Sequence, residues 1–194
     1  MSLDLIKEIR NETGLPLNDI KKAIDTVGEN KESIIKHLRE QGALKSNKRS
    51  DKSTENGSIF SYVHDGRIGV IVEILCETDF VSRSDDFKAL GQNICLQIVA
   101  SQPRFVSSDE VDSKTIDDEM EIQKKLLEAE NKPTEIIEKI LQGKRDRFFE
   151  EIVLLDQPYV KDPSQKIKEI VNSTGQKTGE KIVIKRFTLY VLGR

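Results

Sequence analysis

The spacing of apolar residues changes once along this chain of 194 residues, and that change limits the folds open to it. Up to residue 43, apolar side chains recur every three or four positions, as they do on one face of a helix. From Ser58 onward, runs rich in β-branched and aromatic residues appear between further helical stretches. Residues 45–57 lie between the two parts and contain no apolar residue. They cannot bury surface to offset the entropy of ordering, so they predict a linker.

The N-terminal part predicts three short helices that end at Gly14, Gly28 and Gly42, because glycine favours the left-handed cap after a helix. Their apolar positions are Leu3, Ile6 and Ile9; Leu17, Ile20, Ile24 and Val27; and Ile34, Ile35 and Leu38. Three helices in about forty residues make a bundle near the lower size limit for independent folding. The arrangement resembles ubiquitin-associated (UBA-like) bundles.

The second part opens with a hairpin and a helix. Asp65-Gly66 between two β-rich runs is a strong hairpin signal, and the second strand ends near Glu77. Ser84 is the expected N-cap of a helix that extends to Val99.

The remainder is mostly helical. We expect helices over 109–155, closed by Asn131-Lys132-Pro133 and by Gly143, then a short helix ending near Gly175. The chain closes with a strand over 181–192, which we expect to return and pair with the hairpin.

Together these elements predict an α+β protein: a three-helix UBA-like bundle, then a small antiparallel three-stranded sheet with helices and a helical hairpin. The predicted domains are 1–44 for the bundle, 45–57 for the linker and 58–194 for the core and dimerisation domain, with a helical insertion at about 109–155.

Composition excludes several classes of protein. The net charge of −3 supplies no positive field for a phosphate backbone, so nucleic acid is not the expected partner. The longest apolar run is interrupted by Glu73, which argues against a membrane span. A charged, periodic N-terminus argues against a secretory signal. With Cys76 and Cys95 as the only cysteines, both interpreted as core residues, a reducing cytoplasm is expected.

Catalytic motifs are missing from the sequence. There is no phosphate-binding loop of the GxxxxGK[ST] or GxGxxG type, and residues 175–179 are better interpreted as a turn. His37 and His64 are the only histidines, and no Cys/His spacing suits zinc. We therefore expect no enzyme, cofactor or metal.

Residues 76–83 are the most informative for function, because they join the end of a strand to the start of a helix and can present a loop tip outward. Asp79 and Phe80 place a carboxylate beside a large apolar ring. Two interpretations follow from the residues alone: the ring is a wedge for a partner, or Phe80 is a core aromatic and Asp79 a helix cap.

Several separated motifs occur in the order seen in one family. Thr78–Val81 reads TDFV, preceded by Cys76-Glu77 and followed by Ser82-Arg83. Further motifs are Ile9-Arg10 with Thr13-Gly14, Asp19 with Lys21-Lys22-Ala23, Leu38-Arg39 with Gly42-Ala43, Gly143-Lys144 with Phe148, and Gln157–Val160. The chain thus resembles the elongation factor Ts family, in its short form with a single half-core. It departs from the family pattern at Pro16-Leu17-Asn18, where Gly-Met-Met is common.

The resemblance implies a guanine-nucleotide exchange factor for the GTPase elongation factor Tu. It implies that Phe80 enters an apolar crevice near the Mg²⁺ site of the GTPase, that Asp79 holds the displaced arrangement, and that Thr78 and Val81 fix the turn. Mg²⁺ and then GDP would leave, so that GTP can bind.

Secondary contacts with elongation factor Tu are expected from Arg10 and Leu17 in the bundle and from His64 at the hairpin tip. Leu17 is equally well interpreted as a core leucine. The single half-core and an uncovered sheet edge predict a homodimer, in which one elongation factor Tu contacts residues 78–81 of one chain and His64 of the other.

Two other functions stay open at this point. A UBA-like bundle also suits a pure adaptor, which would bind its target without altering nucleotide release. RNA binding through Lys45, Lys48, Arg49 and Lys52 is the second, although these residues lie in a polar segment with no aromatic side chain for base stacking.

Overall fold

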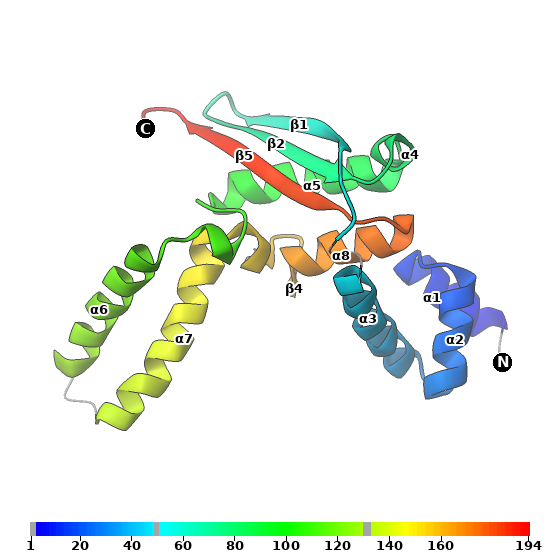
Figure 1. The fold of residues 1–194 in the computed structure, drawn as a ribbon, viewed down its shortest axis with the longest axis horizontal. Helices are drawn as coiled ribbons and strands as arrows, with labels where there is room; N and C mark the ends of the chain where they lie inside the picture. The colour runs from blue at the N-terminus through cyan, green and yellow to red at the C-terminus, as the bar shows by residue number, and fades with distance from the viewer. Residues whose placement is uncertain (1–2, 49–50, 130–132) are drawn as a thin grey trace. The chain divides into compact units, whose positions relative to one another are not determined.

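The computed structural model describes residues 3–48, 51–129 and 133–194. Its helices and strands form an α+β arrangement, as the sequence predicts (Figure 1). The chain divides into two compact units. The first unit contains residues 1–59, 73–91 and 169–184, and the second contains 60–72, 92–168 and 185–194.

The N-terminal bundle consists of α1 (Leu3–Thr13), α2 (Leu17–Val27) and α3 (Lys31–Lys48). Glycines with positive φ follow the first two helices, Gly14 at 66° and Gly28 at 83°, which confirms these two predicted helix ends. Gly42 does not end α3, which continues to Lys48. A side chain at residue 42 would meet the side chain of Gln176, so glycine here provides room for close packing.

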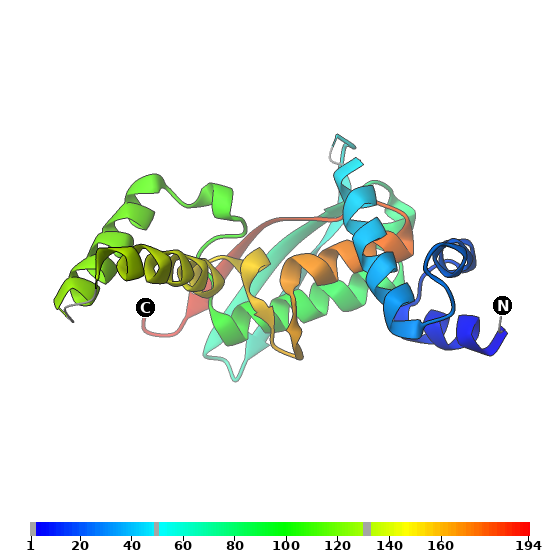
Figure 2. The ribbon, with the colours of Figure 1, turned by 90° about the horizontal axis from the view of Figure 1, so that it is seen from below.

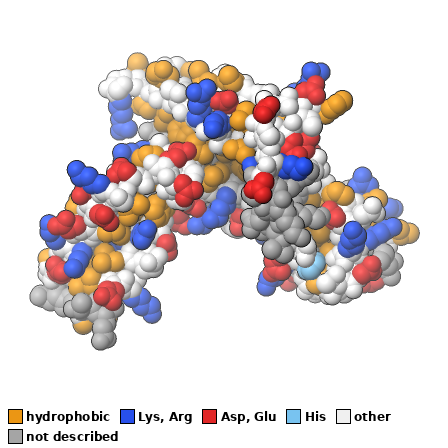
Figure 3. Space-filling view, in the orientation of Figure 1, with side chains coloured by type: hydrophobic (Ala, Val, Ile, Leu, Met, Phe, Trp, Pro, Cys, Tyr) orange, Lys and Arg blue, Asp and Glu red, His pale blue; other side chains and the backbone are white. Residues whose placement is uncertain are grey.

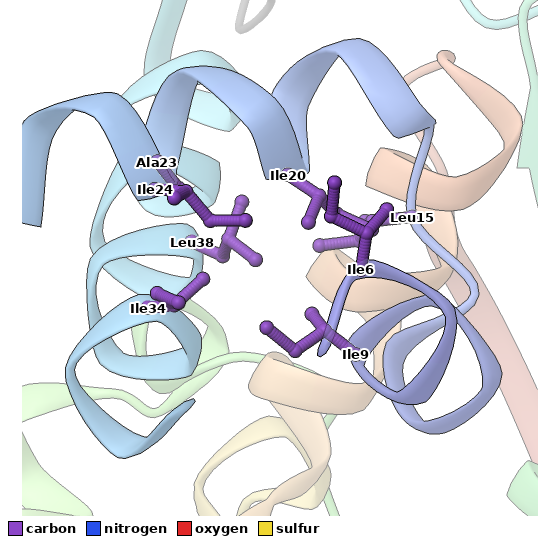
Figure 4. Packing of buried hydrophobic residues seen from close by; sticks show 8 residues of the cluster. All are labelled: Ile6, Ile9, Leu15, Ile20, Ala23, Ile24, Ile34 and Leu38. Carbon is purple, nitrogen blue, oxygen red and sulfur yellow. The ribbon is translucent and has the colours of Figure 1, made fainter. Parts of the chain in front are cut away.

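A separate core stabilises this bundle. Figure 4 shows its buried side chains pointing toward one another from the three helices and, for Leu15, from the connection between α1 and α2. They are Ile6, Ile9, Leu15, Ile20, Ala23, Ile24, Ile34 and Leu38. Burying one leucine or isoleucine side chain contributes roughly 1.5–3 kcal/mol, so the helical spacing of these residues accounts for the fold of the bundle.

Strands β1 (Asn56–His64), β2 (Ile68–Cys76) and β5 (Val183–Val191) form a sheet in the order β1-β2-β5. The predicted hairpin and the predicted return of the last strand are both confirmed. The start of β2 lies beside the end of β5, where Leu192 N donates to Arg67 O, and the end of β2 lies beside the start of β5, where Lys181 N donates to Glu77 Oε1. The two strands are therefore antiparallel.

Helix α5 (Asp85–Ser101) covers one face of this sheet (Figures 1 and 2). Ser84 Oγ accepts a hydrogen bond from Phe87 N at 3.3 Å, which confirms the predicted N-cap. The buried residues of the helix recur every three or four positions, and those of β2 recur every second position. They are Phe87, Leu90, Ile94 and Ile98 on the helix and Val70, Val72 and Ile74 on the strand.

In the second unit, α6 (Ser113–Ala129) and α7 (Thr134–Ile152) pair side by side as the predicted helical hairpin (Figures 1 and 2). Gly143 was predicted to end a helix and lies inside α7 instead. An interior glycine costs a helix only about 1 kcal/mol, which a helix of 19 residues tolerates. The predicted stop at Asn131-Lys132 lies outside the described residues.

Shorter elements complete the chain. They are α4 (Asp79–Ser82), η1 (Ser108–Glu110), η2 (Leu154–Asp156), β3 (Pro158–Tyr159), β4 (Asp162–Lys166) and α8 (Ile167–Thr178). Strands β3 and β4 pair as a second, antiparallel sheet. Helix α8 passes the predicted end at Gly175 and stops before Gly179, whose φ is 75°. A Cβ at residue 175 would lie 2.8 Å from Glu180 O, so Gly175 serves this close approach.

Regular structure enters both ends of the predicted linker 45–57, because α3 reaches Lys48 and β1 begins at Asn56. The domain boundaries themselves stay a prediction. No helix within the described ranges is both long enough and apolar enough to cross a membrane.

Candidate functional site

Phe80 is the most exposed large apolar side chain among those described, at 84% of its full accessibility. It lies in α4, a single helical turn between the end of β2 and the start of α5. Val81 beside it is 9% exposed. The turn thus directs two neighbouring apolar side chains to opposite sides, one into the protein and one into solvent. The interpretation of Phe80 as a core aromatic is wrong.

We call residues 77–83 the Phe80 turn. Thr78 has extended backbone angles and precedes the helix as its N-cap residue. Ser82 N donates to Thr78 O and Arg83 N donates to Asp79 O, both at 3.3 Å. Ser82 Oγ also donates to Asp79 O at 2.8 Å. These bonds close one turn of helix and fix the direction in which residue 80 projects.

Asp79 is paired within the turn. Arg83 Nη2 lies 3.0 Å from Asp79 Oδ2, one helical turn apart, and both side chains are mostly exposed. An exposed pair of this kind contributes at most about 1 kcal/mol, so a cation of a partner can take the place of Arg83. Asp79 lies in the first turn of the helix rather than at the cap position.

The backbone before Phe80 is held by side chains that sequence reasoning did not identify. Glu180 Oε2 accepts hydrogen bonds from Glu77 N at 3.1 Å and from Thr78 N at 3.0 Å. Glu180 Oε1 accepts one from the Thr78 hydroxyl at 2.6 Å. Glu180 is 102 positions from Thr78 along the chain, so no local pattern reveals the pairing.

Cys76 lies under the turn. It is buried, and its Sγ donates a hydrogen bond to Thr78 O at 3.1 Å. Burial raises the pKa of the Cys76 thiol to about 11, and the nearby Glu180 carboxylate adds to the rise. Burial likewise raises the pKa of Cys95 to about 11. Both thiols are neutral core groups at physiological pH, which agrees with their interpretation from the sequence.

The hairpin tip, residues 64–67, belongs to the second unit. Arg67 N donates to His64 O at 2.9 Å across Asp65 and Gly66, whose φ values are 49° and 66°. Two positive φ angles define the tight turn that Asp-Gly favours. The His64 side chain is exposed, with Nδ1 3.1 Å from the Tyr62 hydroxyl and Nε2 3.7 Å from Asp65 Oδ2.

The remaining predicted contacts lie in the bundle. Arg10 is exposed near the end of α1. Leu17 is 39% exposed at the start of α2 and does not belong to the bundle core. A cavity of about 540 Å³ opens between α2, α3 and α8 in the same unit. None of the predicted contact residues lines that cavity.

Similarity to known proteins extends over the whole chain. The family model described as Elongation factor TS matches residues 6–194. The chain belongs to the elongation factor Ts family. Proteins named elongation factor Ts from Thermotoga neapolitana and Thermodesulfovibrio yellowstonii are 42% and 38% identical to it over all 194 residues, which cover 98% and 97% of those proteins. The corresponding protein of Coprothermobacter proteolyticus is 41% identical and is covered to 98%.

Membership of the elongation factor Ts family makes this protein a translation elongation factor, active in protein biosynthesis. No group of three His, Cys, Asp or Glu residues suited to a metal ion occurs in the described parts of the chain. On the face seen in Figure 3, acidic and basic side chains are interspersed over α6 and α7. Phe80 remains the most exposed large apolar side chain among the described residues.

Proposed function

We propose that this protein is a guanine-nucleotide exchange factor. It binds elongation factor Tu in its GDP-bound form, displaces Mg²⁺ and promotes GDP release so that GTP can bind. The observation that carries the proposal is the Phe80 ring, exposed on a turn whose backbone is fixed. Exposing a phenyl ring to water is unfavourable, so a ring held outward in this way suits insertion into an apolar crevice of a partner.

An exchange factor need not touch the nucleotide. It must only bind the nucleotide-free GTPase more tightly than the GDP-bound one. By thermodynamic reciprocity, the factor and GDP then each lower the affinity of the GTPase for the other by the same ratio. Phe80 acts as the wedge that enters elongation factor Tu. Asp79 binds a cation or a backbone group of elongation factor Tu in its displaced conformation, and Thr78 and Val81 fix the turn. The protein forms no covalent bond in this cycle and is not an enzyme in the ordinary sense.

Secondary contacts widen the interface in this proposal. Arg10 and Leu17 dock on the GTP-binding domain, and His64 at the hairpin tip contacts another region of elongation factor Tu. All three side chains are accessible. Since translation takes place in the cytoplasm, we place the protein there, with no membrane and no nucleic acid as direct partner.

We further propose that the protein is a homodimer. Helix α5 covers one face of the sheet, whereas the other face carries exposed apolar side chains. In the second unit these are Val63, Ile71 and Tyr190. Apolar side chains are visible over the strands in Figure 3. A second copy placed on this face would remove these side chains from water. Contacts between the two copies along the outer strand β5 would in addition cover the free edge of the sheet.

Release of fluorescent GDP from elongation factor Tu tests the exchange function. Adding this protein should accelerate release by orders of magnitude, and an adaptor would bind without changing the rate. Light scattering tests the dimer separately. A mass of twice 22.1 kDa is expected at micromolar concentration, and Tyr190→Asp should shift it toward the monomer. A stable monomer of the unaltered protein would exclude the dimer.

A further inference from the structure

The Phe80 ring is 84% exposed, so packing against the rest of the protein does little to hold it. Its position in the free protein therefore depends on the backbone on either side of it. On the C-terminal side the backbone continues into α5, which is anchored in the core by Phe87. On the N-terminal side the chain leaves β2 at Cys76 and must turn sharply, so that side needs contacts of its own.

Two carboxylates supply these contacts reciprocally. Glu180, from the entry to β5, accepts the N–H groups of Glu77 and Thr78 and the hydroxyl of Thr78. Glu77, from the exit of β2, accepts the N–H of Lys181 at 2.7 Å. Hydrogen bonds to charged acceptors contribute about twice as much as neutral ones. This crossed arrangement, which we call the carboxylate clamp, ties the Phe80 turn to the last strand.

The clamp leaves few degrees of freedom at Thr78. Its N–H and its hydroxyl bind Glu180, and its carbonyl accepts from Cys76 Sγ and from Ser82 N. The carbonyl of Glu77 accepts from the Asn56 amide at 2.8 Å. All the polar groups of Thr78 are engaged two residues before the exposed ring, so the clamp fixes the starting point of α4.

The backbone of Glu180 is positioned in turn by α8. Gly179 ends that helix with a positive φ, and Glu180 N donates to Gly175 O at 3.0 Å. A Cβ at residue 175 would lie 2.8 Å from Glu180 O. The helix end therefore determines where the Glu180 carboxylate can reach.

We infer that Glu180 is a positioning residue: it holds the Phe80 turn in the conformation that presents the ring to the partner, without contacting the partner itself. This inference rests on the proposed exchange function for its consequence, but its structural content concerns the free protein. If the hydrogen bonds of Glu180 are removed, Phe80 is still present and the sheet still forms, but the turn adopts many orientations. Binding must then include the entropic cost of ordering the turn.

The test uses the full-length protein with a Phe80→Trp substitution as reporter, because the chain contains no tryptophan. Time-resolved fluorescence anisotropy of the introduced indole reports nanosecond motion of the side chain. Glu180→Ala in this background should raise the amplitude of the fast component roughly twofold or more, because three hydrogen bonds to the turn are lost. Glu180→Gln retains one carbonyl oxygen and should give an intermediate amplitude.

Thr78→Val removes only the hydroxyl donor, so it should raise the amplitude of the fast component less than Glu180→Ala does. Thr78→Ser keeps a hydroxyl group and should return this amplitude to that of the reporter protein. The matched control is Glu138→Ala, an exposed glutamate on α7 of the second unit, which should change nothing. An amplitude unchanged by both Glu180→Ala and Thr78→Val would overturn the inference. If Glu180→Ala does not fold, the comparison of Thr78→Val with Thr78→Ser decides: a larger fast component in Thr78→Val supports the inference, and equal amplitudes overturn it.

Exchange activity is measured in parallel with Phe80 in place. Glu180→Ala should slow GDP release at subsaturating concentration roughly tenfold, because ordering of the turn is added to binding. If the unaltered protein does not accelerate release, the proposed function fails while the anisotropy still decides the role of Glu180. If Glu180→Ala promotes exchange normally although the indole of the reporter variant becomes mobile, the orientation of the turn does not matter for exchange. The inference that Glu180 positions Phe80 for the partner would then be wrong.

Discussion

The Phe80 turn and the hairpin tip are both exposed, and both were expected to contact elongation factor Tu, but they are held in different ways. The turn is fixed by side chains from distant parts of the chain, above all by Glu180. In the hairpin tip, Arg67 O accepts from the distant Leu192 N, but the His64 side chain is held only locally, by the tight turn and by Tyr62, two residues away. A fixed apolar ring suits insertion into a crevice, whereas a locally held polar side chain suits a peripheral contact.

The largest effect is expected for Phe80→Ala. Truncating a central aromatic anchor costs about 2–4 kcal/mol, so affinity for nucleotide-free elongation factor Tu should fall at least roughly thirtyfold. The thermal midpoint should stay unchanged, because the ring contributes little buried area. Isothermal titration calorimetry and circular dichroism measure the two quantities.

Leu126→Ala is the matched control for that substitution, since Leu126 is an exposed leucine on α6. It should leave affinity within about twofold of the unaltered protein, as surface apolar side chains outside an anchor contribute little. An equal loss of affinity in both variants would mean that Phe80 is not an anchor and contributes no more than another exposed apolar side chain.

Val81→Ala sharpens the contrast within the turn itself. Val81 is buried, so removing two methyl groups should lower the free energy of unfolding by about 1–2 kcal/mol. Urea denaturation measures this loss, and Phe80→Ala serves as the comparison with no expected loss. A Val81 variant as stable as the unaltered protein would mean that the turn is not packed onto the core.

His64→Ala should have a small effect. A peripheral contact is worth about 0.5 kcal/mol, so the rate of GDP release should fall roughly twofold, with no change in stability. Fluorescent GDP release measures it against Phe80→Ala. If His64→Ala slowed GDP release as much as Phe80→Ala does, the hairpin tip would contribute as much to exchange as the Phe80 turn.

The smallest effect concerns the thiols. With pKa values raised to about 11 by burial, Cys76 and Cys95 are protonated at a mildly alkaline pH and should react very slowly with a maleimide in the native protein. Both should react quickly in guanidinium chloride. Fast labelling of Cys76 in the native state would show that the Phe80 turn above it opens readily.

Local patterns predicted much of the fold correctly. Asp65-Gly66 predicted the hairpin, and Ser84 predicted the start of α5. Three glycines misled the prediction of helix ends. Gly42 and Gly175 lie inside helices, where glycine allows a close approach: the Gln176 amide occupies the place of a Cβ at residue 42, and backbone Glu180 O lies 2.8 Å from that of residue 175. These approaches depend on the packing of the folded chain, which the local sequence pattern does not show. Nothing in the structure requires glycine at residue 143, where an added Cβ would meet no atom within 4 Å.

The site was predicted only in part. The motif at residues 78–81 pointed to the exposed ring, and the structure places Phe80 outward. The clamp was missed, since Glu77 and Lys181 are 104 positions apart and each is an ordinary surface-type residue in its own segment. Pairing of a carboxylate with the backbone N–H groups of a remote segment depends on how the strands return, and the sequence of either segment alone does not carry that information.

The most direct test of the account compares the affinity of this protein for elongation factor Tu with and without bound GDP. Reciprocity requires that an exchange factor bind the nucleotide-free form more tightly, by the same ratio in which it weakens GDP. We predict a large ratio for the unaltered protein and a markedly smaller ratio for Phe80→Ala. Equal affinity of the unaltered protein for both forms would contradict the account.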